Sequence, residues 1–127
     1  MKKILNTMNH VLNNEQIIDL NNMFDNVEVL DLRDENNELF KQISNISVDA
    51  NLNDLAEQLL NVAKEFDMVI LPIGSPAFMF KFATKTHANM NITFLFAHSD
   101  RSVIEKTNND GTITKTSVFK HVKFLVM

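Results

Sequence analysis

Hydrophobic positions follow two spacings along this chain, and the two alternate. Four short segments carry the continuous or alternating apolar residues typical of strands: residues 2–8, 27–32, 68–71 and 92–97. Between them, apolar residues recur every three or four positions, most clearly over residues 51–66, which is the pattern of a helix packed on one face. Strands alternating with helices predict a single α/β domain over residues 1–127 with a mainly parallel sheet.

Polar residues mark where the helices begin. Asn13 is predicted to cap the first helix, with Gln16 reaching back and Leu12 packing on Ile17. A third helix is predicted to begin at Pro76, capped by Ser75.

The C-terminal third reads as a β-hairpin. Residues 102–106 are predicted to pair with residues 112–124 around a turn at Asn108-Asn109-Asp110-Gly111. A short helical turn is expected at residues 38–43, and the rest of 33–51 carries no recognisable motif.

Composition narrows the function classes. The chain has no cysteine, which excludes disulfides, Cys-based zinc sites and thiol catalysis. Neither a signal peptide nor a membrane span is expected, so we expect a cytoplasmic protein that does not enter a membrane. A net charge of −4 disfavours long nucleic acids but allows a small anionic ligand held by a local cluster of donors. The four histidines are scattered, and we expect neither a metal site nor a cofactor.

Polar residues follow three of the predicted strands at their carboxyl ends, where ligands bind in open α/β sheets. They are Asn9 and His10 after the first strand, Gly74 and Ser75 after the third, and His98, Ser99 and Arg101 after the fourth. We expect the three loops to converge on one sheet edge.

Each loop also has a plain structural interpretation. Gly74 and Ser75 form either an anion site at a helix start or a simple cap. The segment from His98 to Arg101 offers an imidazole, a hydroxyl and a guanidinium, or is only a polar turn. His10 alone is compatible with a structural hydrogen bond.

Two further features have open interpretations. Alternation places Phe119, His121 and Lys123 on one strand face, which either contacts the ligand or is solvated. In the third helix, Phe78 and Phe82 share one face while Phe80 points away. A helix apolar on both sides predicts a homodimer, the alternative being a fully enclosed helix in a monomer.

These loops also carry an ordered pattern that resembles a known family. In order, it comprises Asn9-His10-x-Leu12-x-x-x-Gln16, Ile70-Leu71-Pro72-Ile73-Gly74-Ser75-Pro76, Phe96-Ala97-His98-Ser99-x-Arg101, Asp110-Gly111, Lys115 and Ser117-Val118-Phe119-Lys120-His121-Val122-x-Phe124. Together they resemble the small stand-alone CRISPR-associated ring nucleases of type III systems, over nearly the whole chain.

The resemblance implies a Rossmann-like, CARF-related fold that is usually dimeric. It implies a cyclic oligoadenylate ligand, most often cyclic tetra-adenylate, which is the second messenger of type III CRISPR immunity. Opening this ring would switch the antiviral response off. In a metal-independent reaction a ribose 2′-OH attacks its neighbouring phosphate and leaves a 2′,3′-cyclic phosphate.

The chemistry of the residues suggests their roles in such a phosphodiesterase. Ser75, the backbone of Gly74 and Arg101 would hold phosphate, and His98 or His10 would move the proton. The remaining candidate ligand contacts are Asn9, Ser99 and His121. The alternatives are a sensor or sponge that holds the nucleotide uncut, and a small dimeric interaction protein.

Overall fold

The computed structural model describes the backbone of residues 1–89 and 91–126, with side chains except at 88, 89, 100–102, 117–120 and 122. The elements in chain order are β1 (Lys2–Asn6), α1 (Asn14–Phe24), β2 (Val27–Asp31), α2 (Leu32–Glu35), α3 (Asn37–Ser44), α4 (Leu52–Ala63), β3 (Met68–Leu71), α5 (Pro76–Asn89), β4 (Thr93–Thr107) and β5 (Ile113–Val126). The expected alternation of strands and helices is confirmed.

One sheet of five strands organises the chain, in the order β2-β1-β3-β4-β5. The first four strands run parallel, and β5 pairs antiparallel with β4. The chain runs from β1 to β2 on one side of β1, and then crosses to β3 on the other side of β1. The direction of the strand order therefore reverses between β1 and β3. The carboxyl ends of these two strands therefore flank the crevice where open α/β sheets bind ligands.

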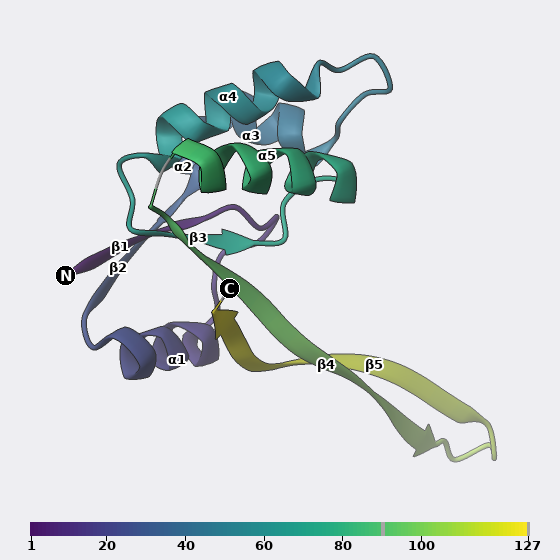
Figure 1. Cartoon of the computed structure of the whole chain (residues 1–127). Helices are drawn as coiled ribbons and strands as arrows, with labels where there is room; N and C mark the ends of the chain where they lie inside the picture. The colour runs from purple at the N-terminus through teal and green to yellow at the C-terminus, as the bar shows by residue number, and fades with distance from the viewer. Residues whose placement is uncertain (90, 127) are drawn as a thin grey trace.

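Helices cover both faces of the sheet (Figure 1). On one face, α3, α4 and α5 enclose a core that includes Leu5, Val69 and Phe78. On the other face, α1 packs over a second core that includes Ile4, Leu20 and Ile70. Neighbouring residues of one strand point to opposite faces, so both faces of the central strands must be apolar.

The helix starts form as the polar residues predict. Asn13 and Gln16 make a reciprocal capping box on α1, and the Ser75 hydroxyl accepts a hydrogen bond from the Phe78 N–H at 3.1 Å. Phe78 and Phe82 are fully buried, whereas Phe80 is 75% exposed, which confirms the assignment of faces on α5.

The expected end of the fourth strand at residue 97 is wrong. β4 continues without a break to Thr107, so the segment from His98 to Arg101 is strand rather than turn. β3 ends at Leu71, opposite Phe96, and beyond that point β4 pairs with β5 as a two-stranded ribbon that projects from the body (Figure 1). Residues 98–107 contain no Gly or Pro to stop a strand, and residues 103–107 are exposed, where polar residues are tolerated.

The turn at the end of this ribbon lies where the sequence predicts it. The Gly111 N–H donates to the Asn108 carbonyl at 3.0 Å. In the part of the chain that the structure describes, no helix has the length and apolar character needed to span a membrane.

Candidate functional site

A cavity of about 580 Å³ opens at the carboxyl edge of the parallel strands. It is lined by Met8, His10, Asn13, Gln16, Pro72, Ala97, His98, Ser99 and His121. A smaller neighbour of about 210 Å³ shares Met8, His10 and Pro72 with it and adds Asn9, Ile73 and Gly74. We call the two together the histidine cavity. The volume of its larger part falls in the range of roughly 300–1,000 Å³ that is usual for small-ligand sites.

The loop after β1 is held by a buried asparagine. Asn6 donates from its side-chain amide to the His10 carbonyl at 3.0 Å and to Asp31 Oδ1 at 2.7 Å. Its Oδ1 accepts the Met8 N–H at 3.1 Å. Since every polar atom of the Asn6 amide has a partner, the side chain fixes the loop that carries His10.

Arg33, at the start of α2, supports the same loop from the other side. Its guanidinium donates to the Asn9 carbonyl at 2.5 Å and lies over the Phe40 ring, 5.1 Å from the centroid. Its Nε atom is buried and has no hydrogen-bond partner among the described residues. A permanent positive charge therefore stands behind the Asn9 loop.

His10 and the first helix contribute ring and amide groups to the cavity. Nδ1 of the exposed His10 lies 3.1 Å from the Val11 carbonyl, which only accepts, so Nδ1 carries the proton and Nε2 is left as an acceptor in the neutral ring. In the capping box, the oxygens of Asn13 and Gln16 are each used by a backbone N–H. Within the part of the chain that the structure describes, neither NH₂ group makes a hydrogen bond, so both remain as donors at the cavity wall.

Gly74 and Ser75 have separate tasks. Gly74 lines the smaller part of the cavity with a positive φ of 56°. Ser75 is not among the lining residues, and its hydroxyl oxygen accepts from the Phe78 N–H as the cap of α5. The Ser75 oxygen is thus used structurally, while its O–H proton stays available as a donor.

His98 and Ser99 reach the cavity from a strand, not from a loop. The pairing of β4 with β5 shifts by one residue between His98 and Ser99, which pair with Lys123 and His121 respectively. Such a bulge re-aims side chains at the point where a regular ladder would continue. The Arg101 side chain lies outside the described residues, so its expected role has no structural account.

The His121 side chain is buried, so the solvated-face interpretation is wrong for His121. It holds for Lys123, and the Phe119 side chain lies outside the described residues. The side chain of His121 is 4% exposed, while Lys123 is exposed. The bulge breaks the alternation that would place the two residues alike. His121 Nε2 lies 3.1 Å from Oδ2 of Asp19 on α1, and the same oxygen accepts the Phe124 N–H at 3.1 Å. The ring also packs on Phe124, with centroids 4.8 Å apart.

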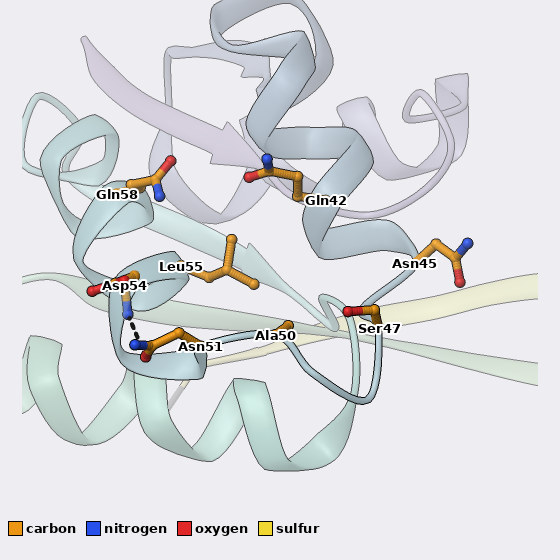
Figure 2. A pocket seen from close by; sticks show the side chains of 8 residues that line it. All are labelled: Gln42, Asn45, Ser47, Ala50, Asn51, Asp54, Leu55 and Gln58. Carbon is orange, nitrogen blue, oxygen red and sulfur yellow. Dashed lines mark hydrogen bonds between the residues drawn. The ribbon is translucent and has the colours of Figure 1, made fainter.

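A second cavity, of about 380 Å³, lies between α3 and α4, and Figure 2 shows the side chains that line it. Four neutral amides dominate its wall, and the amide oxygen of one of them, Asn51, accepts the Asp54 N–H at 3.2 Å as the cap of α4. Among the described residues, its wall contains no histidine and shares no residue with the histidine cavity. We therefore place the candidate site in the histidine cavity. Across the described residues, no group of three or more His, Asp or Glu side chains is placed to hold a metal ion.

The structure thus brings together most of the residues proposed from the sequence. Asn9, His10, Gly74, His98, Ser99 and His121 all line the histidine cavity. Sequence reasoning missed Asn6, Asp19 and Arg33 as its supports. A polar Asn6 ending an apolar strand is a local signal that could have identified the first, whereas Asp19 and Arg33 have ordinary surface patterns.

Comparisons with known proteins identify a family but no characterised relative. Searches of curated proteins and of solved structures give no match. The model of the uncharacterized protein MJ1673 family matches residues 2–125. Because that match spans nearly the whole chain, this protein belongs to the uncharacterized protein MJ1673 family.

Proposed function

We propose that this protein is a ring nuclease that binds a cyclic oligoadenylate, with cyclic tetra-adenylate as the first candidate, and opens it without a metal ion. In this proposal the fold is a Rossmann-like, CARF-related variant of the α/β architecture. The main observation that supports this proposal is that three histidines from three separate segments line one cavity. They are His10 after β1, His98 in β4 and His121 in β5. The resemblance of the sequence to type III CRISPR ring nucleases supports the choice of ligand.

Histidines suit the chemistry of such a reaction. Attack of a 2′-OH on the adjacent phosphate needs one group to accept a proton and another to supply one, and imidazole does both near neutral pH. His98 and His10 are the exposed rings of the cavity and are the first candidates for direct proton transfer. The Ser99 hydroxyl and the free NH₂ donors of Asn13 and Gln16 are available for phosphate oxygens or base edges.

The phosphates would lie toward the smaller part of the cavity. Gly74 leads there into the N-terminus of α5, where backbone N–H groups and the helix dipole favour an anion. The charge of Arg33 behind Asn9 favours the same placement. The cavity of one chain suits part of a cyclic oligoadenylate better than the whole ring, which agrees with a two-fold dimer giving one half-site per subunit.

The decisive experiment is incubation of the purified protein with cyclic tetra-adenylate in EDTA, followed by separation of products. We expect a linear product that ends in a 2′,3′-cyclic phosphate. Activity lost in EDTA and restored by a divalent cation would contradict the metal-independent mechanism. Tight binding without cleavage would instead identify a sensor or sponge. A protein that neither binds nor cleaves the nucleotide would contradict the proposal and favour the alternative of a small dimeric interaction protein.

Variants assign the roles. His98→Ala is expected to slow the single-turnover rate by ~10²–10⁴-fold with nearly unchanged affinity, because it removes a proton carrier. His10→Ala is the comparison within the site, and His87→Ala, on the exposed end of α5, is the control outside it. Full activity of His98→Ala together with an inactive His10→Ala would move the proton-transfer role to His10.

A further inference from the structure

Asp19 and the buried side chain of His121 form a polar pair between elements far apart in the sequence. Nε2 of His121 lies 3.1 Å from Asp19 Oδ2, across a separation of 102 residues. The His121 side chain is 4% exposed and that of Asp19 is 27% exposed. The Phe124 N–H binds the same carboxylate oxygen, which holds the acid in place against β5.

The partners of the ring determine where its proton lies. An ionised carboxylate only accepts hydrogen bonds, so Nε2 is the protonated nitrogen of a neutral His121. The lone pair then lies on Nδ1, which is buried and has no hydrogen-bond partner among the described residues. A buried acceptor without a partner calls for an explanation, and a ligand that supplies the missing donor provides one.

The histidine cavity is the place from which such a donor would come. His121 lines it, beside His98 and opposite Ser99 in the strand register. Nδ1 is closed to water in the free protein, so the ring or its neighbours must shift slightly when a ligand enters. Catalytic hydrogen bonds commonly tighten only in the complex.

We propose that His121 is the proton acceptor of the reaction and that Asp19 is its positioning residue. This deepens the proposed function and rests on it. The 2′-hydroxyl gives its proton to Nδ1 of His121, and its oxygen bonds to the adjacent phosphorus. The P–O5′ bond breaks, and the leaving 5′-oxygen takes a proton from the protonated ring of His98. Asp19 keeps Nε2 protonated and stabilises the charged ring that forms, as carboxylates do beside catalytic histidines.

Two pairs of variants test the assignment. His121→Gln keeps a polar side chain but removes the base, and His87→Gln is its control at an exposed histidine. Asp19→Asn keeps the shape of the acid but removes its charge, and Glu15→Gln is its control on the same helix. We expect His121→Gln and Asp19→Asn each to lose ~10²–10⁴-fold in single-turnover cleavage of cyclic tetra-adenylate, with affinity changed less than about threefold. The two controls should cleave at the wild-type rate.

If the contacts of Asp19 with His121 and Phe124 only hold α1 against β5, the variants will give a different result. Loss of melting temperature that tracks loss of activity, or wild-type cleavage by folded His121→Gln, would overturn the assignment. A readout on the ring itself keeps the test independent of folding: ¹⁵N NMR of the wild type should show the Nε2–H form of His121, and Asp19→Asn should depopulate it. A wild-type ring in the Nδ1–H form would also overturn it.

Failure of this inference can be told apart from failure of the proposed function. A wild-type protein that cleaves no cyclic oligoadenylate overturns both. A wild-type protein that cleaves while His121→Gln cleaves equally well overturns only the role of His121.

Discussion

At the scale of single residues, the backbone at Gly74 couples the site to the core. The residue has φ +56°, and a Cβ atom there would lie 2.8 Å from the carbonyl oxygen of Ile43 and 3.2 Å from Ile46 Cδ1. Glycine is therefore required twice, for conformation and for space. The local sequence indicates a turn at this position but not the approach of α3.

Gly74→Ala should lower the free energy of unfolding by more than the ~1–3 kcal/mol that the backbone conformation costs alone. Gly111→Ala is the matched control, because Gly111 has φ +88° but a Cβ atom added to it would meet no atom within 4 Å. Urea unfolding of both variants measures the difference. Equal losses would show that the contact with Ile43 is relieved without cost.

Asp110 offers a test by pH. Hydrogen bonds from the Thr112 hydroxyl and then from its backbone N–H hold the pKa of the Asp110 carboxyl below its ordinary value. A lowered pKa in the folded state means that the turn is stabilised above the ordinary pKa and loses this contribution as pH falls through the lowered one. An NMR titration should show a lowered pKa for the Asp110 carboxyl. Thr112→Val removes the hydroxyl that donates to this carboxylate and should raise the Asp110 pKa. An unchanged midpoint in that variant would contradict the assigned cause.

At the scale of elements, α5 has two faces with different tasks. Phe82 is buried, with its ring centroid 6.5 Å from that of Phe78 and 5.8 Å from that of Phe94. Phe82→Ala should cost ~3–5 kcal/mol of unfolding free energy because it leaves a cavity in the core. The Phe80 ring is exposed in the single chain, so Phe80→Ala should cost little at concentrations low enough to keep the protein monomeric, and thermal unfolding there distinguishes the two variants. Similar losses under those conditions would mean that the Phe80 ring is covered within one chain.

At the scale of the whole molecule, the same exposed ring supports the prediction of a homodimer. The Phe80 ring is 75% exposed in the single chain, and covering it with a second subunit would remove its apolar surface from water. We expect light scattering at micromolar concentration to give a dimer and Phe80→Asp to give a folded monomer. A monomeric wild-type protein would contradict this prediction.

The sequence by itself determined the elements whose signals are local. The Asn13–Gln16 capping box, the Ser75 cap and the turn before Gly111 each depend on residues within a few positions, so short-range spacing predicts them. The polar residues after β1 and β3 could be placed at one sheet edge because parallel strands end on the same side.

Only the tertiary structure decided the length of β4 and the surroundings of His121. Whether a polar segment continues as a strand depends on the neighbour that pairs with it, and β5 approaches through a register shift that periodicity cannot show. Asp19 and His121 meet across 102 residues, and Arg33 reaches Asn9 across 24. Contacts between such distant residues are set by how whole elements pack, which leaves no pattern in either local segment.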